Sequence, residues 1–70
     1  MAEIRAEMVA NVWKVLVSEG DQVDDGDTLV ILESMKMEIP VLAETPGIVT
    51  KLHVADGDVV QEDELIAEIG

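Results

Sequence analysis

The sequence lacks cysteine, tyrosine and phenylalanine, and it contains one histidine and one tryptophan in 70 residues. Without cysteine the chain can form neither disulfide bonds nor a thiolate metal site. A lone histidine has no second imidazole with which to share a metal. The sequence also offers no pairing of a nucleophile with a base. These absences argue against an enzyme and a metalloprotein, so we expect no catalytic and no metal-binding residues.

Basic residues are also scarce: four of them face sixteen acidic ones, which gives a formal net charge of −12. Nucleic acids and anionic membranes repel such a surface, so neither is expected as a partner. No apolar run is long enough to cross a bilayer, and no basic segment leads into an apolar one as in a signal peptide. We therefore expect a cytoplasmic protein, monomeric when isolated, whose partners present basic docking surfaces.

Valine, isoleucine and leucine dominate the sequence and are interrupted by Gly-Asp pairs. Residues 12–17, 28–33 and 37–42 are typical of strands. Residues 18–21 and 24–27 are typical of turns, because they combine glycine with aspartate. No stretch shows helical periodicity together with a helix cap. The sequence therefore predicts an all-β protein.

The second half of the sequence repeats the first. Six residues recur at a constant spacing, with Val12, Lys14, Val17, Gly20, Asp21 and Val23 becoming Val49, Lys51, Val54, Gly57, Asp58 and Val60. The spacing is then expected to shorten by one residue, so that Leu29 matches Leu65 while Asp63 stands about where Gly26 does. Neither half can bury its apolar face alone. We therefore expect two similar halves, related by a pseudo-twofold axis, that pack as a small sandwich or flattened barrel.

The apolar residues of the expected strands are the candidates for the core. They are Val12, Val15, Val17, Val23, Leu29, Ile31, Val49, Leu52, Val54, Val60, Leu65 and Ile69. Truncation of a central one, such as Leu29, to alanine should cost about 2–5 kcal/mol. His53 stands at the repeat position of Leu16 and is expected to be a half-exposed strand residue without a catalytic role. Trp13 matches Thr50 and is expected at the surface or at the edge of the core.

One lysine is unusual for its position near the link between the two halves. Lys36 lies between Met35 and Met37, directly after one expected strand and before the next. The simplest geometry is a β-hairpin with Met35 and Lys36 at its two-residue tip, which would hold the amine in water. Pro40, in the strand that follows, lacks an N–H group and is therefore confined to a sheet edge or to a strand start. A lone amine between long apolar side chains favours an attachment point over a salt-bridge partner.

The segment from Glu33 to Glu38 reads Glu-Ser-Met-Lys-Met-Glu, and Gly-Asp turns occur at residues 20–21 and 57–58. Together they resemble the biotinyl domain, the biotin carboxyl carrier domain of biotin-dependent carboxylases. Residues 45–49 are similar to that family's start of the second repeat. The resemblance covers nearly the whole chain and identifies residues 1–70 as a single domain. It implies a barrel-sandwich hybrid, a flattened β-barrel of two four-stranded antiparallel sheets with pseudo-twofold symmetry.

The resemblance also implies a carrier function for the domain. Lys36 would be acylated by biotin–protein ligase, which uses biotinyl-adenylate. The covalent biotin arm would then take a carboxyl group from biotin carboxylase to a carboxyltransferase, often one that acts on an acyl-CoA. The flanking residues would form the recognition motif, namely Glu33, Ser34, Met35, Met37 and Glu38. The chain looks like small stand-alone biotinylated proteins or like a domain cut from a larger carboxylase.

One departure and two alternatives accompany this interpretation. Residues 9–11 read Val-Ala-Asn, where the family more often has a Pro-Gly-like start as at residues 46–47. A lipoyl domain shares the fold and a hairpin lysine, but that lysine is usually flanked by aspartate and alanine, so Met35 and Met37 favour biotin. An unmodified interaction module that binds a basic partner through its acidic surface is the second alternative. It requires Lys36 to be dispensable.

Overall fold

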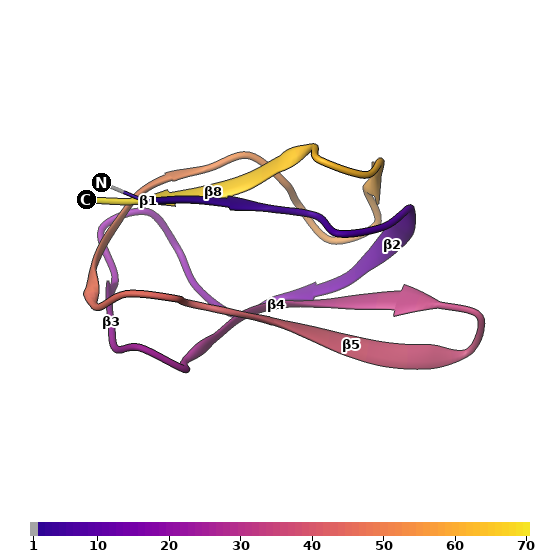
Figure 1. Cartoon of the computed structure of the whole chain (residues 1–70), viewed down its shortest axis with the longest axis horizontal. Helices are drawn as coiled ribbons and strands as arrows, with labels where there is room; N and C mark the ends of the chain where they lie inside the picture. The colour runs from indigo at the N-terminus through magenta and orange to yellow at the C-terminus, as the bar shows by residue number, and fades with distance from the viewer. Residues whose placement is uncertain (1) are drawn as a thin grey trace.

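The computed structural model describes residues 2–70, in which all regular structure is β. The strands are β1 (Ala2–Arg5), β2 (Ala10–Val15), β3 (Gln22–Val23), β4 (Thr28–Ser34), β5 (Met37–Leu42), β6 (Gly47–Leu52), β7 (Val59–Val60) and β8 (Leu65–Ile69). They form two four-stranded antiparallel sheets, ordered β1-β8-β6-β3 and β5-β4-β2-β7 (Figure 1). Since residues 2–70 contain no helix, no helix there could cross a membrane. The predicted all-β fold with two four-stranded sheets is confirmed.

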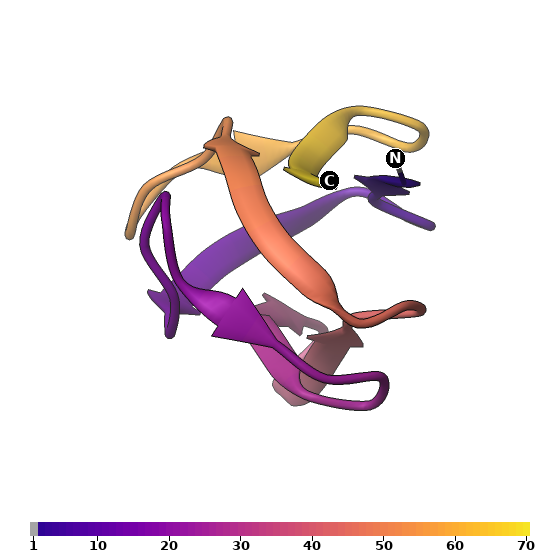
Figure 2. The ribbon, with the colours of Figure 1, turned by 90° about the vertical axis from the view of Figure 1, so that its left-hand side faces the viewer.

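The molecule is elongated, with principal extents of 31 × 17 × 17 Å. The two chain ends lie together at one end, and the hairpin of β4 and β5 extends at the other (Figure 1). Seen from the end that carries the termini, the strands surround a common interior (Figure 2). The hairpin is therefore held away from the rest of the chain at one extremity of the fold.

A pseudo-twofold axis relates the two halves, because backbone hydrogen bonds occur in exchanged pairs. Gly20 N donates to Val49 O, and Gly57 N donates to Val12 O, each at 2.8 Å. Both the donors and the acceptors are 37 residues apart in the sequence. Each half thus contributes a turn that closes on a strand of the other half, and the predicted pseudo-symmetry is confirmed.

The spacing of 37 residues continues through β4 and β8, so the predicted shortening by one residue is wrong. Leu16 N donates to Leu29 O at 2.9 Å, and His53 N donates to Ile66 O at 2.8 Å. Leu29 therefore corresponds to Ile66 and not to Leu65. The repeat paired two leucines because they are the same residue type. In the structure, Leu29 and Ile66 occupy equivalent sheet positions, and both are fully buried.

The turns before β4 and β8 have the same length, which explains the constant spacing. Gly26 has φ of 93° and Asp63 has φ of 68°, so both adopt the left-handed conformation. Aspartate tolerates this conformation better than most side chains do. The expected equivalence of Asp63 and Gly26 is confirmed, although the turn around Asp63 is not shortened.

The core lies between the sheets and differs from the predicted one in β4 and β8. A register shift between Thr28 and Val30 lets Leu29 and Val30 both face inward. Ile31 consequently points to the outer face, and Leu65 is likewise half-buried and outside the core. Both were wrongly predicted as core residues. The buried set comprises Ile4, Ala6, Ala10, Val12, Val23, Leu29, Val30, Leu32, Ala43, Val49, Val54, Val60, Ile66, Ala67 and Ile69.

The first long strand, β2, begins and ends two residues earlier than the predicted range 12–17. Ala10 pairs with Val60, so the strand starts before its first valine. At its other end, Val15 N donates to Asp56 Oδ1 at 2.8 Å instead of to a strand. The prediction for residues 37–42 matches β5, and β4 extends the range 28–33 by one residue.

Candidate functional site at the β4–β5 hairpin

The hairpin of β4 and β5 ends in a two-residue loop. The strands pair from Thr28 with Leu42 to Ser34 with Met37, which leaves Met35 and Lys36 as the loop residues. Their φ angles are 53° and 64°. Positive φ at both central residues defines a type I′ turn, whose twist matches that of the flanking strands. The predicted hairpin tip is confirmed.

The tip uses side chains that the turn itself does not favour. Type I′ turns strongly prefer Asn-Gly or Asp-Gly, whereas this turn contains methionine and lysine. The left-handed conformation costs an ordinary side chain about 1–2 kcal/mol. Strain of this kind is typical of functional sites, where the surrounding structure maintains it. The choice of Met35 and Lys36 therefore reflects their side chains and not the needs of the backbone.

The amine at the tip is open to solvent between two exposed apolar side chains. Met35 is 92% exposed and Met37 is 61% exposed, and Lys36 is exposed as well. Within residues 2–70, the Nζ atom of Lys36 takes part in no hydrogen bond and no ion pair of the structure. A second protein can therefore reach this amine without first breaking a contact in the fold.

The remaining residues of the predicted motif lie directly below the tip. Glu33 pairs across the strands with Glu38, and Ser34 pairs with Met37. Both glutamates are exposed, and like charges directly opposite each other destabilise a sheet. The structure thus brings all six motif residues into one hairpin end, where the acidic pair gives no benefit to folding.

The hairpin is anchored on one side only. β4 pairs with both β2 and β5, whereas β5 is the edge strand of its sheet. Pro40 lies in this edge strand, opposite Ile31. The prediction that Pro40 marks an edge is confirmed. The position of Lys36 is fixed through β4, which is bonded to neighbours along both of its sides.

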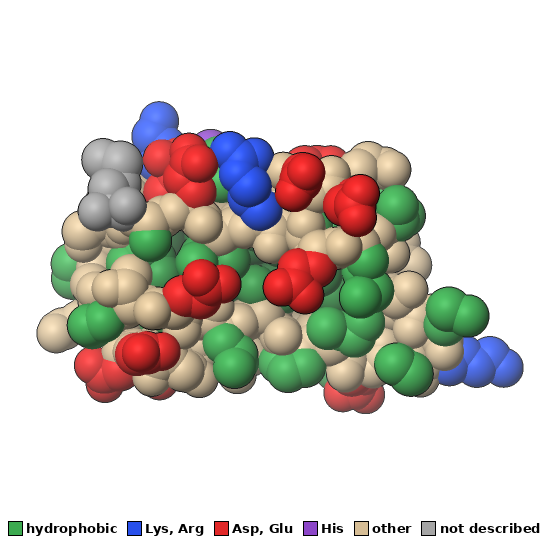
Figure 3. Space-filling view, in the orientation of Figure 1, with side chains coloured by type: hydrophobic (Ala, Val, Ile, Leu, Met, Phe, Trp, Pro, Cys, Tyr) green, Lys and Arg blue, Asp and Glu red, His purple; other side chains and the backbone are tan. Residues whose placement is uncertain are grey.

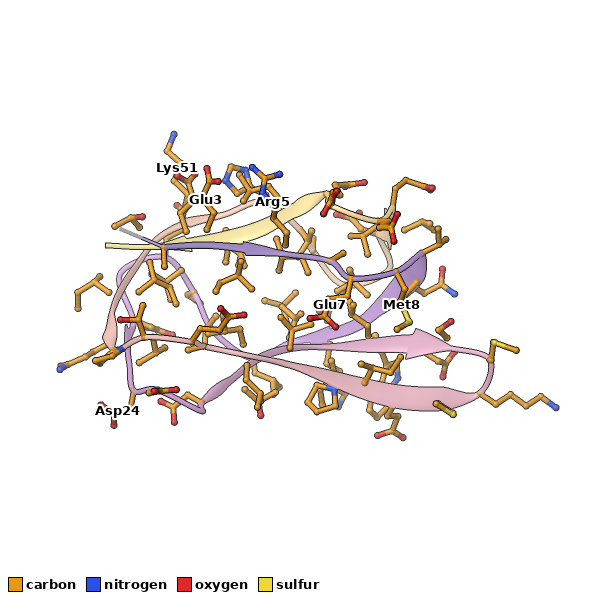
Figure 4. All side chains as sticks on the ribbon, viewed as in Figure 1. Glu3, Arg5, Glu7, Met8, Asp24 and Lys51 are labelled. Atoms are coloured by element: carbon orange, nitrogen blue, oxygen red, sulfur yellow. The ribbon has the colours of Figure 1, made fainter. Side chains whose placement is uncertain are left out.

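A groove separates the two edge strands β1 and β5 in the middle of the molecule. Its volume is about 380 Å³, and its apolar floor includes Ile4 and Val41. Glu7 and Glu44 also line it, and Figures 3 and 4 show acidic side chains on this face beside hydrophobic ones. Lys36 is not among the lining residues. Residues 2–70 also hold no cluster of three potential metal ligands. The hairpin amine is therefore presented outside this groove.

Sequence reasoning missed a structural use of the acidic residues. In four turns a carboxylate accepts a hydrogen bond from the backbone N–H three residues earlier, at distances of 2.8–3.1 Å. The acceptors are Asp21, Asp27, Asp58 and Glu64. Two further carboxylates, of Glu19 and Asp56, bond backbone N–H groups of the other half. The regular spacing of acids in the turns was a usable signal for the first four.

Comparison with known proteins gives a family match over almost the whole chain. Residues 2–69 match the family described as "Biotin-requiring enzyme". The "Biotinylated protein TB7.3 homolog" of Mycobacterium leprae is 64% identical over 70 residues, which is 99% of either chain. The "Biotin/lipoyl attachment protein" of Bacillus subtilis is 44% identical over 66 residues, covering 94% of this chain and 90% of its own.

Solved structures and longer relatives match in the same way. The urea carboxylase of Kluyveromyces lactis superposes with a TM-score of 0.92 at 35% identity, over 99% of this chain and 6% of that chain. A lipoyl domain of the 2-oxoglutarate dehydrogenase complex of Azotobacter vinelandii superposes at 0.85, but its 24% identity shows the fold alone. The alpha3 subunit of a biotin-dependent acyl-coenzyme A carboxylase of Mycobacterium leprae is 46% identical over 94% of this chain and 11% of its own.

Proposed function

This chain belongs to the biotin/lipoyl attachment family as a biotinyl domain, and we propose that the Nζ atom of Lys36 is the atom that carries its biotin. The observation that supports this assignment is the type I′ tip, which exposes one amine between Met35 and Met37. The domain is a carrier and does not itself catalyse a reaction.

The chemistry at Lys36 is the formation of one amide bond. Its amine loses a proton and attacks the acyl carbon of biotinyl-adenylate, and adenylate leaves with the electron pair of the broken bond. Since Lys36 is exposed and its amine has no hydrogen-bond partner within residues 2–70, the base must come from the ligase that binds the domain. Amide formation removes the positive charge of Lys36 and lengthens the arm. When bound, biotin supplies a ureido nitrogen that can accept and release a carboxyl group.

The proposed role is transport of a carboxyl group between two enzyme sites, a biotin carboxylase and a carboxyltransferase. A rigid domain with one long arm raises the local concentration of the carried group at each site, without needing a cleft of its own. We assign the acceptor to the acyl-CoA class. This assignment is supported by the 46% identity to the acyl-coenzyme A carboxylase subunit.

The proposed setting follows from charge. A net charge of −12 opposes self-association and favours partners with basic surfaces. We therefore propose a cytoplasmic domain, monomeric when isolated, that meets the ligase and the carboxylase subunits by electrostatic attraction. The exposed Glu33 and Glu38 beside the tip are the residues placed to take part in that attraction.

The test is the intact mass of the domain after co-expression with biotin–protein ligase. We expect the mass of one added biotinyl group, lost in Lys36→Arg and retained in the matched controls Lys14→Arg and Lys51→Arg. No added mass in the wild type, or an added mass that survives Lys36→Arg, would contradict the assignment.

The two alternatives are distinguished in the same preparations. A lipoyl domain would react with an anti-lipoate antibody and not with streptavidin, whereas we expect the reverse. An unmodified interaction module would keep its partner binding in Lys36→Arg. The exposed methionines on both sides of Lys36 favour biotin over each alternative.

A further inference from the structure

The pseudo-twofold axis provides a matched position in one sheet for each outward position of the other. Six positions on the outer side of the sheet β5-β4-β2-β7, five in its strands and one directly after β2, are apolar, and all six counterparts 37 residues away are polar or charged. We call the first set the apolar face: Trp13, Leu16, Ile31, Pro40, Leu42 and Val59. The counterparts are Thr50, His53, Glu68, Glu3, Arg5 and Gln22. One pair is reversed, since Asn11 matches the exposed Ile48.

The centre of the apolar face spans three paired strands, β2, β4 and β5, while Val59 lies at its edge opposite Asn11. Pro40 lies opposite Ile31, and Ile31 lies opposite Lys14. The Lys14 Nζ atom lies 5.3 Å from the centroid of the Trp13 ring. A register shift between Val12 and Lys14 marks a bulge at Trp13. The matching shift between Val49 and Lys51 shows that this bulge belongs to the repeated fold. In the first half it presents the only aromatic residue of the sequence to solvent, where the second half has Thr50.

The fold does not require these residues to be apolar. His53 Nε2 and Glu68 Oε2 form a contact of 2.9 Å on the opposite sheet, at the positions that Leu16 and Ile31 occupy here. Each matched pair has the same degree of burial, so both residue types suit the same backbone site. Trp13, Leu16 and Val59 are nonetheless 43%, 50% and 56% exposed. Exposed apolar side chains gathered on one face are characteristic of an interaction surface.

The two faces also differ in overall character. In Figure 3, basic and acidic side chains crowd the upper margin over β1, and Figure 4 identifies Glu3, Arg5 and Lys51 there. Hydrophobic side chains lie along the lower part of the same view, over β5. Charged side chains are therefore denser on the side of β1 than on the side of β5, where a few acidic groups lie among hydrophobic ones.

The place of the apolar face indicates its occupant. Strands β4 and β5 supply three of its residues and also carry the Lys36 hairpin, so the face lies beside the attachment site, with only the pair Glu33 and Glu38 between them. A standard interface needs about 800 Å² per partner, which a two-residue tip does not offer. The acidic pair Glu33 and Glu38 borders the face at the hairpin end. A second copy of this chain, with its charge of −12, is repelled there, whereas a basic rim is attracted.

We propose that the apolar face is the docking surface for the enzyme that loads Lys36, biotin–protein ligase, through an apolar patch with a basic rim. The inference rests on the proposed function, because it takes the ligase as the partner. Trp13 is its central contact, since tryptophan is enriched among the residues that dominate binding energies. The lysine supplies the reacting amine, and the face holds the domain while the reaction takes place.

The test exchanges residues between the two halves. The triple variant Trp13→Thr, Leu16→His and Val59→Gln installs side chains that the matched positions already accept. We expect KM for the domain in ligase-catalysed biotinylation to rise by about tenfold or more, with kcat little changed. The matched control, Thr50→Trp with His53→Leu and Gln22→Val, places apolar residues on the opposite sheet and should leave KM unchanged.

The outcomes separate this inference from the proposed function. Thermal melts first establish that both triple variants are folded; if the apolar-face variant is not, the single change Trp13→Thr is used instead. An unchanged KM in a folded variant overturns the docking surface. A wild type that is not biotinylated at Lys36 overturns the proposed function instead. Sedimentation of a wild-type dimer that the apolar-face variant abolishes would assign the surface to a second copy and overturn the inference.

Discussion

At the scale of single residues, the most informative difference between the halves is the start of β6. Gly47 has φ of 158°, and a Cβ atom there would lie 2.8 Å from both Gly70 O and Ile69 Cγ2. Its counterpart in the first half is Ala10, which is not among the residues with positive φ. The departure at residues 9–11 thus coincides with a local difference in backbone geometry.

Gly47→Ala should therefore destabilise the fold more than glycine substitutions in the turns. We expect a loss of about 2–4 kcal/mol, because close contacts with the final strand add to backbone strain. Gly57→Ala is the control: its φ is 90°, nothing lies within 4 Å of the added Cβ, and only about 1–2 kcal/mol is expected. Urea unfolding of the three proteins gives the order, and equal losses would contradict this account.

The residues of the site were easier to predict than those that support it. Lys36 and its neighbours form one contiguous segment, so the sequence contains the whole site in readable order. The hydrogen bond from Val15 N to Asp56 Oδ1 joins residues 41 positions apart, and that from Leu52 N to Glu19 Oε2 joins residues 33 apart. No local pattern shows which acid reaches which distant N–H group.

At the scale of elements, predictability depended on the length and residue types of each strand. β5 was predicted with its bounds because it is long and follows a turn. β3 and β7 have two residues each, and two residues cannot show a periodicity. The predicted range for β2 started two residues too late because Ala10 and Asn11 have low strand propensity, although both pair with β7.

The hairpin tip should show a conflict between stability and recognition. Met35→Asn is expected to stabilise the fold by about 1 kcal/mol, because asparagine adopts the left-handed conformation more easily than methionine does. We expect the same change to lower the rate of biotinylation, because it removes an apolar side chain next to Lys36. Thermal melts and initial rates measure the two effects.

Met35→Leu is the matched control, since it keeps an apolar side chain and the unfavourable φ of 53°. Its melting temperature and biotinylation rate should both stay near those of the wild type. If Met35→Asn were modified as fast as the wild type, Met35 would have no part in recognition.

At the scale of the whole molecule, the excess of negative charge should lower the melting temperature. A net charge of −12 on a chain of 70 residues repels itself in the compact state. Raising the ionic strength from about 0.01 M to about 0.15 M shortens the screening length from about 30 Å to about 8 Å. We expect Tm to rise over this range in calorimetry, equally with NaCl and KCl. A constant or falling Tm would show that the acids are balanced locally.

The two-sheet arrangement was predictable because the sequence repeats. The difference between the sheets, apolar outward residues on one and polar ones on the other, was not predictable. The repeat fixes which strands correspond, and burial in β4 and β8 then fixes the register. The residues of the apolar face, such as Trp13, differ from their counterparts, so the repeat could not show that they share one side of the molecule. Their common location became clear only from the arrangement of the two sheets in the structure.

The pairing of the first strand with the last also brings the two ends of the described chain together, so that the fold is close to a closed ring. Ala2 pairs with Ile69 just as Ile39 pairs with Leu32, which places the chain ends where a second hairpin would stand. A copy of the segment Glu33–Glu38 inserted between Ile69 and Ala2 would close that ring and give it a lysine at each extremity. Cutting the original tip would then yield a circular permutant with the same core. The Lys36 hairpin is thus, topologically, the joint between the two similar halves of the chain.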